Sequence, residues 1–280
     1  MHFERISEAP AIGLPSVGKL DRPLAGVRVL DLTRIIAGPV GGRTLAAHGA
    51  DAMLVNAPHL PNIDSIIDTS RGKLSAQVDL RSTDGQRAID GLVKCSHVLL
   101  QGYRPGGLAQ MGYSPAELAH KRPGIVVISL SAYGTRGPWA QWRGFDSLVQ
   151  TATGFNAAEA SASGASDPTA MPVQILDYAT GFPVAYAVSA ALLRQQQEGG
   201  SWHVQLSLAQ TGHWLRSLGT VHGGFAALMP ARERYVEPSA SGYGDLLAIR
   251  HSAQLSRTPV GWARPSMPPG SHAPVWPASL

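Results

Sequence analysis

Short apolar runs alternate with longer amphipathic segments through most of the chain. The runs have the length and residue types of β-strands, and one of them, IVVISL, is apolar at nearly every position. A strand of that kind is typical of a sheet covered by helices on both faces. Strands are predicted at residues 27–32, 52–55, 95–101, 124–130 and 202–208.

The segments between these strands carry apolar positions at helical spacing, with start and stop signals at their ends. Pro39 stands at the start of one helix and Gly49 after its end, while Ser114 and Glu117 form a capping box. Helices are predicted at 40–48, 84–93, 114–120, 145–154, 178–197 and 209–218. The alternation predicts an α/β fold, with an open, doubly wound, mostly parallel sheet and helices on both faces.

This regular pattern is confined to the middle of the chain and divides it into four parts. Residues 1–22 are predicted to be a loosely ordered arm, and residues 23–218 form the large α/β domain. Residues 219–231 form a connection. Residues 232–280 are rich in Pro, Gly and Ser, which predicts an extended C-terminal segment that returns to the large domain.

Composition narrows the classes of function. With 44% hydrophobic and 15% charged residues, the chain is typical of a globular protein. The formal net charge is +4, but Lys and Arg are scattered, so we expect no nucleic-acid binding. Scattered positive charge suits a phosphorylated or acidic small molecule.

Cysteine content and the N-terminal sequence indicate the compartment. Cys95 is the single cysteine, and its place in the predicted strand 95–101 favours a buried apolar thiol. A chain with one cysteine has no internal disulfide, which is typical of a reducing compartment. The segment MHFERISEAPAIGL lacks a signal-peptide pattern, and no apolar run approaches membrane-spanning length. We therefore expect a cytoplasmic protein with no membrane partner.

A doubly wound sheet binds its ligand beyond the carboxyl ends of its strands. The candidate segments are residues 33–38, 102–107 and 131–137, and the stretch ahead of Asp177. None carries G-x-G-x-x-G, which disfavours a nicotinamide or flavin enzyme. H-E-x-x-H and G-x-S-x-G are also absent, so we expect neither a metal site nor a nucleophile elbow.

Three turns combine glycine with cations. The segment RGK at 71–73 is able to grip a phosphate, with a solvated turn as the alternative. In GYRPGG at 102–107, a Tyr beside an Arg offers a ring to stack on adenine and a guanidinium to pair with phosphate. A plain turn after the strand is the alternative there. The turn YGTRGP at 133–138 is ambiguous in the same way.

Asp177 stands just ahead of the longest predicted helix, within MPVQILDYATGF. An Asp at that place commonly caps the helix, and the helix dipole stabilises its charged form. A carboxylate held at a helix start beside a water-poor cleft is also able to attack an activated acyl group and form an anhydride. The residues alone leave both roles open.

Several segments, taken together and in order, resemble the class III CoA-transferases, the family of formyl-CoA transferase, carnitine CoA-transferase and methylacyl-CoA racemase. The match runs from about residue 22 to residue 210. The segments are RPLAGVRVLDLTRIIAGPVGGRTLAAHGAD, RGKLSAQVDLRSTDG, HVLLQGYRPGGLAQMGYSP, VVISLSAYGTRGPWAQWRGFD, MPVQILDYATGFPVAYAVSAALL and GGSWHVQLSLAQ.

The resemblance implies an enzyme that moves CoA from an acyl-CoA to a carboxylic acid acceptor, with Asp177 as nucleophile. The implied intermediates are an aspartyl anhydride and an enzyme-bound CoA thioester. Coenzyme A is then a substrate, and no permanently bound cofactor is expected. By the same matching, five further segments contact CoA, through Ile36, Ala37, Arg71, Lys73, Val78, Asp79, Leu80, Arg81, Gly102, Tyr103, Arg104, Gly134, Thr135, Arg136 and Gly137.

The racemases of this family use a His–Asp pair, with the His in a segment resembling R-x-G-H-D. Here the segment is RGFD, in which Phe145 precedes Asp146. A phenyl ring does not titrate, so this replacement favours a transferase over a racemase.

Two departures from the family pattern keep other functions open. Ile36 stands where family members commonly have Gln, and the family's small second domain is much shortened, with residues 219–231 as the remnant of its connection. Family members form interlocked dimers, so a homodimer or a partner chain is expected. The main alternative is a non-catalytic or partner-dependent CoA-binding homologue in which Asp177 only caps the helix. An acyl-CoA racemase is a third, less favoured reading.

Overall fold

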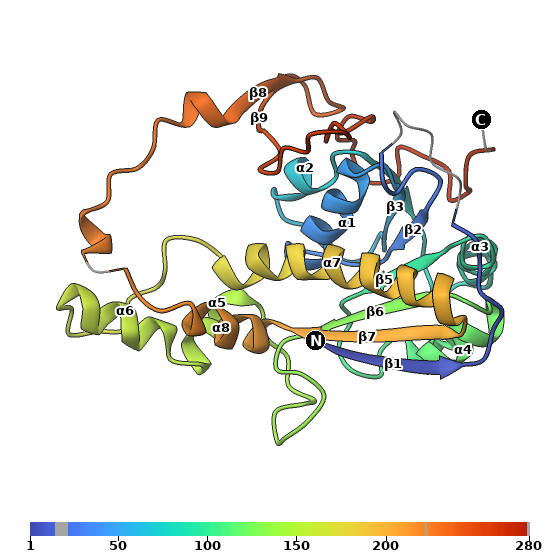
Figure 1. Ribbon diagram of the computed structural model, residues 1–280, viewed down its shortest axis with the longest axis horizontal. Coiled ribbons are helices and arrows are strands. Elements are labelled where there is room, and N and C mark those ends of the chain that lie inside the picture. Colours follow the sequence, from blue (N-terminus) through green and yellow to red (C-terminus); the bar gives the residue numbers. More distant parts are fainter. Residues whose placement is uncertain (15–21, 222, 279–280) are drawn as a thin grey trace.

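The computed structural model describes residues 1–14, 22–221 and 223–278, and seven strands form one sheet in it (Figure 1). Part of the predicted N-terminal arm, residues 15–21, lies outside the described residues. The strands lie in the order β1 (His2–Ser7), β7 (Ser201–Ser207), β6 (Val126–Ser131), β5 (Val98–Gln101), β2 (Arg28–Asp31), β3 (Asp51–Asn56) and β4 (Lys73–Gln77).

All pairs in this sheet are parallel except that of β1 with β7. The chain builds β2, β3 and β4 outward in one direction, then crosses back to β5 and builds β6 and β7 in the other. The carboxyl ends of β2 and β5 therefore form the switch point at which a doubly wound sheet opens a crevice. The predicted fold class is confirmed.

Helices cover both faces of the sheet. The α-helices are α1 (Ala37–Ala47), α2 (Ile66–Thr69), α3 (Thr83–Lys94), α4 (Pro115–Lys121), α5 (Asp146–Ala152), α6 (Phe155–Ser163), α7 (Ile175–Glu198) and α8 (Leu208–Ser217). Short 3-10 turns lie at Ala109–Met111, Gly224–Ala226 and Arg232–Tyr235, and a two-stranded sheet joins β8 (Val236–Ser239) to β9 (Leu246–Ile249).

Alternate residues of the central strands belong to two different cores. Val29 packs with α1 and α7 on one face, whereas its neighbour Leu30 packs with α3 and α4 on the other. This alternation follows from the period of two in a strand, and it explains why the sequence runs are apolar at nearly every position. Helix α7 is long and apolar enough to cross a membrane by length and composition, but it packs on α1 and the sheet as a core helix does.

Helices α1 and α7 approach each other through glycines. A Cβ atom on Gly41 would lie 2.5 Å from Val184, and one on Gly181 would lie 2.4 Å from Val40. Only residues without a side chain allow this spacing. The close packing fixes the start of α7 against the start of α1.

Several predicted elements differ from the observed ones. Residues 2–7, expected in a loosely ordered arm, form β1 at the sheet edge. Strand β4 and helix α6 were not predicted. Cys95 does not begin a strand, because it caps the C-terminus of α3 and is exposed, which corrects the expected buried thiol.

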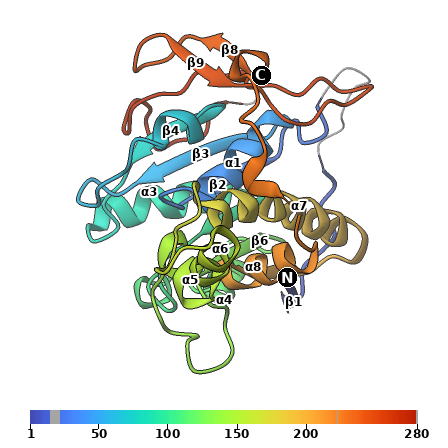
Figure 2. The same cartoon turned by 90° about the vertical axis from the view of Figure 1, so that its left-hand side faces the viewer.

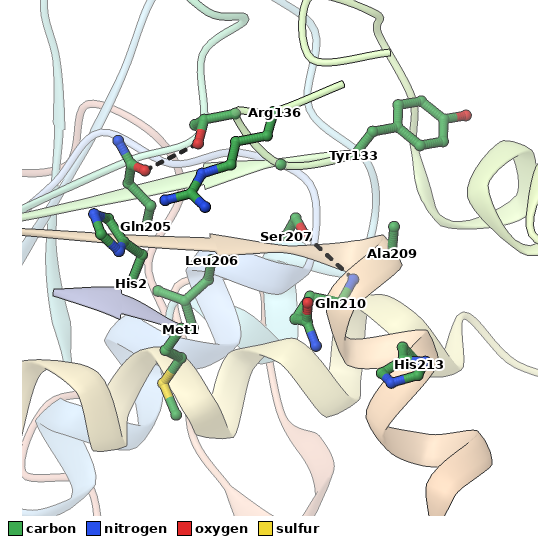
Figure 3. A pocket seen from close by; sticks show the side chains of 12 residues that line it. Met1, His2, Tyr133, Arg136, Gln205, Leu206, Ser207, Ala209, Gln210 and His213 are labelled. Atoms are coloured by element: carbon green, nitrogen blue, oxygen red, sulfur yellow. Dashed lines mark hydrogen bonds between the residues drawn. The ribbon is translucent and has the colours of Figure 1, made fainter. Parts of the chain in front are cut away.

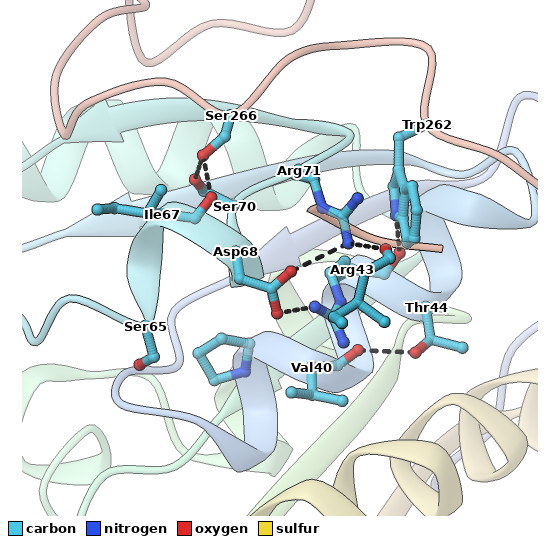
Figure 4. A network of polar contacts seen from close by, with 12 residues as sticks. Val40, Arg43, Thr44, Ser65, Ile67, Asp68, Ser70, Arg71, Trp262 and Ser266 are labelled. Carbon is cyan, nitrogen blue, oxygen red and sulfur yellow. Dashed lines mark hydrogen bonds and ion pairs between the residues drawn. The ribbon is translucent and has the colours of Figure 1, made fainter. Parts of the chain in front are cut away.

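The C-terminal segment lies along the β3–β4 side of the domain (Figures 1 and 2). The Trp262 indole donates a hydrogen bond to the Arg43 carbonyl at 3.1 Å, and the Arg71 guanidinium lies 3.9 Å from the centre of its ring (Figure 4). Further along, His272 exchanges two hydrogen bonds with the backbone of Ser75 in β4, at 2.8 and 3.0 Å. These contacts hold the segment on the large domain.

Candidate functional site

A cavity of about 390 Å³ lies at the switch point of the sheet. The loops after β2, β5 and β6 and the starts of α1, α7 and α8 form its walls. Its lining residues are Leu32, Thr33, Arg34, Ile35, Ala37, Gly38, Leu60, Gly102, Tyr103, Arg104, Pro105, Leu130, Ser131, Ala132, Trp142, Arg143, Gly144, Phe145, Asp177 and Leu208. The cavity thus stands where a doubly wound sheet binds its ligand.

The loop after β2 is organised by a buried ion pair. Lys73 Nζ lies 2.7 Å from Asp31 Oδ2 and donates to the Pro39 carbonyl at 2.8 Å, and both side chains are fully buried. The other carboxylate oxygen of Asp31 accepts the Thr33 backbone N–H at 3.0 Å. Beyond Thr33, Ile35 has a φ of 72°, which is a strained conformation for a β-branched residue.

Asp177 is the third residue of α7 and is only 4% exposed. It lines the cavity, and its carboxylate makes no hydrogen bond or ion pair with any other described residue. The N-cap of α7 is Gln174, so Asp177 does not have the capping role considered from the sequence. The carboxylate is therefore left available to the cavity, at the positive end of the helix dipole.

A second acid holds Asp177 in place. Asp146, the first residue of α5, is 1% exposed, and its Oδ2 accepts the Asp177 backbone N–H at 2.8 Å. Its Oδ1 accepts a hydrogen bond from the Gln150 amide, which also donates to the Val173 carbonyl at 3.1 Å. The segment that leads into α7 is therefore fastened to α5 at two points, Val173 and Asp177.

The surroundings of Asp177 raise its pKa from the ordinary 3.8 to about 7. Burial is the larger cause, and the nearby charge of Asp146 is the smaller one. Burial removes water from the charged form, and a second negative charge repels it. The group therefore changes its ionisation close to neutral pH.

Four of the residues predicted to contact CoA line the same cavity as Asp177. They are Ala37, Gly102, Tyr103 and Arg104. Tyr103 is held by its backbone N–H, which donates to Gln101 Oε1 at 3.0 Å. The side chain of Arg104 makes no ion pair or hydrogen bond within the described part of the chain, so its charge is available to a ligand. Ile36 is buried beside the cavity at 6% exposure and does not line it.

Arg71 and Lys73 are engaged within the protein, contrary to the expectation that they contact a ligand phosphate. Arg71 is 2% exposed, pairs with Asp68 at 3.0 Å and donates to the Ile249 carbonyl at 2.6 Å (Figure 4). Lys73 is sealed in its pair with Asp31. Neither cation lines the cavity, and the alternative of a solvated turn does not hold either.

The segment at 78–81 also lies outside this cavity. Val78 and Leu80 are buried in the core, and the Arg81 guanidinium donates two hydrogen bonds to the Asp79 carboxylate, at 2.7 and 2.9 Å. This pairing lowers the pKa of the Asp79 carboxyl far below its usual range.

The predicted residues Gly134, Thr135 and Arg136 line a different cavity, of about 440 Å³, beside β1 and the start of α8 (Figure 3). Thr135 donates a hydrogen bond to Gln205 Oε1 at 3.1 Å in its wall. Gly137 lines neither of the two cavities. The turn at 102–107 thus lines one cavity, and the turn at 133–138 lines another.

Several residues of the site were not predicted from the sequence. Thr33, Arg34 and Ile35 belong to the candidate ligand-binding segment 33–38, but the sequence singles out none of them, and it shows Asp146 only as part of RGFD. The sequence indicates Phe145 only as the residue in place of a His. In the part of the chain that the structure describes, no group of three or more His, Cys, Asp or Glu is arranged to hold a metal ion.

Comparisons with known proteins agree with this geometry. The model of CoA-transferase family III matches residues 24–244. An acetyl-coenzyme A transferase, nodX, of Hypoxylon pulicicidum is 32% identical over 71% of this chain and 35% of its own length. A succinate–glutarate CoA-transferase of Agrobacterium fabrum is 30% identical over 66% of this chain and 51% of its own. The chain thus spans between a third and about a half of these relatives.

The solved structures include the same fold. A crystal structure of Rv3272 from Mycobacterium tuberculosis superposes with a TM-score of 0.65 and 30% identity, covering 71% of this chain and 59% of that one.

Proposed function

The chain belongs to CoA-transferase family III, and from this premise we propose that it moves CoA from an acyl-CoA thioester to a carboxylic acid with Asp177 as nucleophile. One observation carries the proposal. The carboxylate of Asp177, 4% exposed and without a partner among the described residues, opens into the cavity at the switch point of the sheet. A carboxylate freed from water in this way is a stronger nucleophile than one in solution.

The proposed reaction has four displacement steps. An Asp177 oxygen attacks the thioester carbonyl, the C–S bond breaks, and an aspartyl anhydride and CoA thiolate result. The thiolate attacks the aspartyl carbonyl, forms an aspartyl–CoA thioester and releases the donor acid as its carboxylate. The acceptor carboxylate then attacks this thioester and releases the thiolate again. The thiolate finally attacks the acceptor carbonyl of the new anhydride, which frees Asp177.

The other residues of the cavity have supporting roles in this proposal. Arg104 and the Tyr103 ring, which lie after β5, would bind the phosphates and the adenine of CoA. Ala37 and the backbone of the strained loop at Ile35 would border the pantetheine arm. Phe145 lines the cavity but carries no titrating group, which favours transfer over racemisation.

Two further features support a carboxylic acid acceptor and a second chain. A relative that is 30% identical over 205 aligned residues is named as a succinate–glutarate CoA-transferase, and both of those named compounds are carboxylic acids. Helix α7 exposes Phe182, Tyr186 and Leu193 by 46 to 62%, which supports a homodimer or a partner chain over a lone subunit. Coenzyme A takes part as a substrate in this proposal.

Trapping with hydroxylamine tests the proposal. The protein is mixed with hydroxylamine and each of a panel of acyl-CoA donors. It is then digested, and the masses of its peptides are measured by mass spectrometry. Hydroxylamine attacks the aspartyl carbonyl of the anhydride or thioester, so we expect an Asp177 hydroxamate that forms only with a donor. The isosteric variant Asp177→Asn is the control and should stay unmodified. An unmodified wild-type peptide with every donor, together with measurable CoA binding, would favour a binding-only homologue.

A further inference from the structure

Aromatic side chains follow one another along the loop between β6 and α5, which projects from the body of the domain (Figures 1 and 2). The Trp139 and Trp142 rings are stacked at 5.2 Å, with 13° between their planes, and Tyr133 meets Trp139 edge-on at 5.3 Å. Trp142 is 56% exposed and Phe145 is 65% exposed. Large apolar side chains gathered and left open in this way commonly mark a binding surface.

Trp142 and Phe145 belong to the wall of the cavity that holds Asp177. The order of the strands separates this aromatic wall from two of the cations that line the cavity. Arg34 and Arg104 follow β2 and β5, whereas Trp142, Phe145 and Leu208 follow β6 and β7. A CoA ester whose phosphates lie over β2 and β5 and whose carbonyl reaches Asp177 therefore directs its acyl group toward β6 and β7.

Ser131 and Arg143 also line the cavity on that side, but the packing beneath the wall is apolar. Ala132, Leu176, Leu208 and Val149 form one buried cluster under the wall. Gly144 holds the loop against this cluster, because an added Cβ there would lie 3.0 Å from both Ala132 and Val149. Gly144 thus fixes the loop that carries Trp142 and Phe145 to the core.

We propose that Trp142 and Phe145 form the binding surface for the acyl group, and that this group is apolar, of the aromatic or medium-chain class. The inference rests on the proposed function, because it takes the thioester carbonyl to lie at Asp177. The apolar character of the acyl group follows from the surface. An aliphatic chain or a phenyl ring that packs on two exposed aromatic rings removes apolar area of both the ligand and the protein from water.

Arg143 is the group that would recognise a dicarboxylic acyl chain instead. It lines the same cavity but is exposed. An ion pair at an exposed Arg contributes little in water, whereas apolar contact does not depend on such screening. The surface therefore favours an apolar group over one with a second carboxylate.

Binding of non-cleavable thioethers tests the inference. Dissociation constants are measured by calorimetry for CoA, S-octyl-CoA and S-(3-carboxypropyl)-CoA, none of which has an acyl carbonyl to be attacked. We expect S-octyl-CoA to bind at least about tenfold more tightly than CoA, and the carboxylate analogue to bind no more tightly than CoA. Trp142→Ala and Phe145→Ala should each remove most of the octyl gain and leave CoA itself unchanged.

Trp214→Ala is the matched control, because Trp214 is 47% exposed on α8 and does not line this cavity. It should keep the full octyl gain. An octyl analogue that binds no better than CoA, a preference for the carboxylate analogue, or full octyl gain in both cavity variants would overturn the inference. Failure of hydroxylamine trapping with the octyl preference intact would overturn the proposed chemistry alone.

Discussion

The Oδ2 atom of Asp146 accepts the backbone N–H of Asp177 at 2.8 Å, so one buried acid positions another at the start of α7. The bond fixes the backbone, whereas the charge of Asp146 acts on the Asp177 carboxyl through space. These two effects are separable, because an amide oxygen accepts the same hydrogen bond without the charge.

Asp146→Asn should lower the pH at which the reaction becomes half-maximal. In the wild type, activity should rise with pH through about 7, as Asp177 loses its proton and becomes a nucleophile. Removing the neighbouring charge leaves burial as the remaining cause of the raised pKa, so the midpoint should fall without reaching the ordinary 3.8. Initial rates measured across the pH range check this. Asp167→Asn, which removes an exposed charge, should not move the midpoint.

Asp177→Asn should stabilise the protein in alkaline solution. The folded pKa is raised, so the folded state holds a proton that the unfolded state releases between about pH 4 and 7, and stability falls as pH rises through this window. The variant escapes this loss and should gain at most about 4 kcal/mol at about pH 8. Below about pH 4 both forms are neutral, so the gain from this source should vanish. Urea unfolding at the two pH values measures the difference, and an equal gain at both would contradict the linkage.

Lys73→Met should destabilise the fold strongly. It leaves the Asp31 carboxylate buried and without its cation, which typically costs about 3–5 kcal/mol. The double variant with Asp31→Asn should recover much of the loss, because the amide oxygen still accepts the Thr33 N–H without a charge. Lys94→Met, at the exposed end of α3, is the control and should change the free energy of unfolding little. A Lys73 variant as stable as this control would show that the pair does not organise the loop after β2.

The same substitution should have opposite effects at two glycines. Gly181→Ala places a Cβ 2.4 Å from Val40, so we expect a loss of about 1–3 kcal/mol from forcing α1 and α7 apart. Gly91→Ala in α3 meets nothing within 4 Å and should gain about 0.5–1 kcal/mol from helix propensity. Thermal and urea unfolding measure both. Because α7 carries Asp177, we also expect Gly181→Ala to lower activity, while Gly91→Ala should keep it.

Much of the fold could be predicted because its central strands are apolar on both faces. The runs around Val29, Leu99 and Val127 could be recognised as strands from the sequence, because each of their residues faces a helix on one side of the sheet or the other. Strand β4 reads KLSAQ and was missed, because its Lys, Ser and Gln resemble a surface turn. Its burial depends on Asp31, which lies 42 residues away, and on the C-terminal segment that covers it. Such partners are not visible in local sequence.

The candidate site, too, could be predicted only in part. Asp177 and the 102–104 turn could be placed together, because strand ends in a parallel sheet meet at one edge. The roles of Arg71 and Lys73 could not, because a cation in sequence carries no sign of the distant carboxylate or carbonyl that engages it. Asp146 gave a local hint in RGFD, but its bond to Asp177 spans 31 residues. The sequence pattern also predicts a helix start at residue 178, three residues after the observed start at Ile175, and this later start makes Asp177 resemble a cap.

Strand β1 pairs with β7 along one margin of the sheet, and His272 occupies both backbone groups of Ser75 on the opposite margin. Strand β1 is itself the last strand in the sheet order, so its outer side is a border on which a strand from another molecule could add. At the β4 border, His272 takes the Ser75 amide and carbonyl out of such pairing. The two margins therefore differ in how far they protect the fold from ribbon-like aggregation.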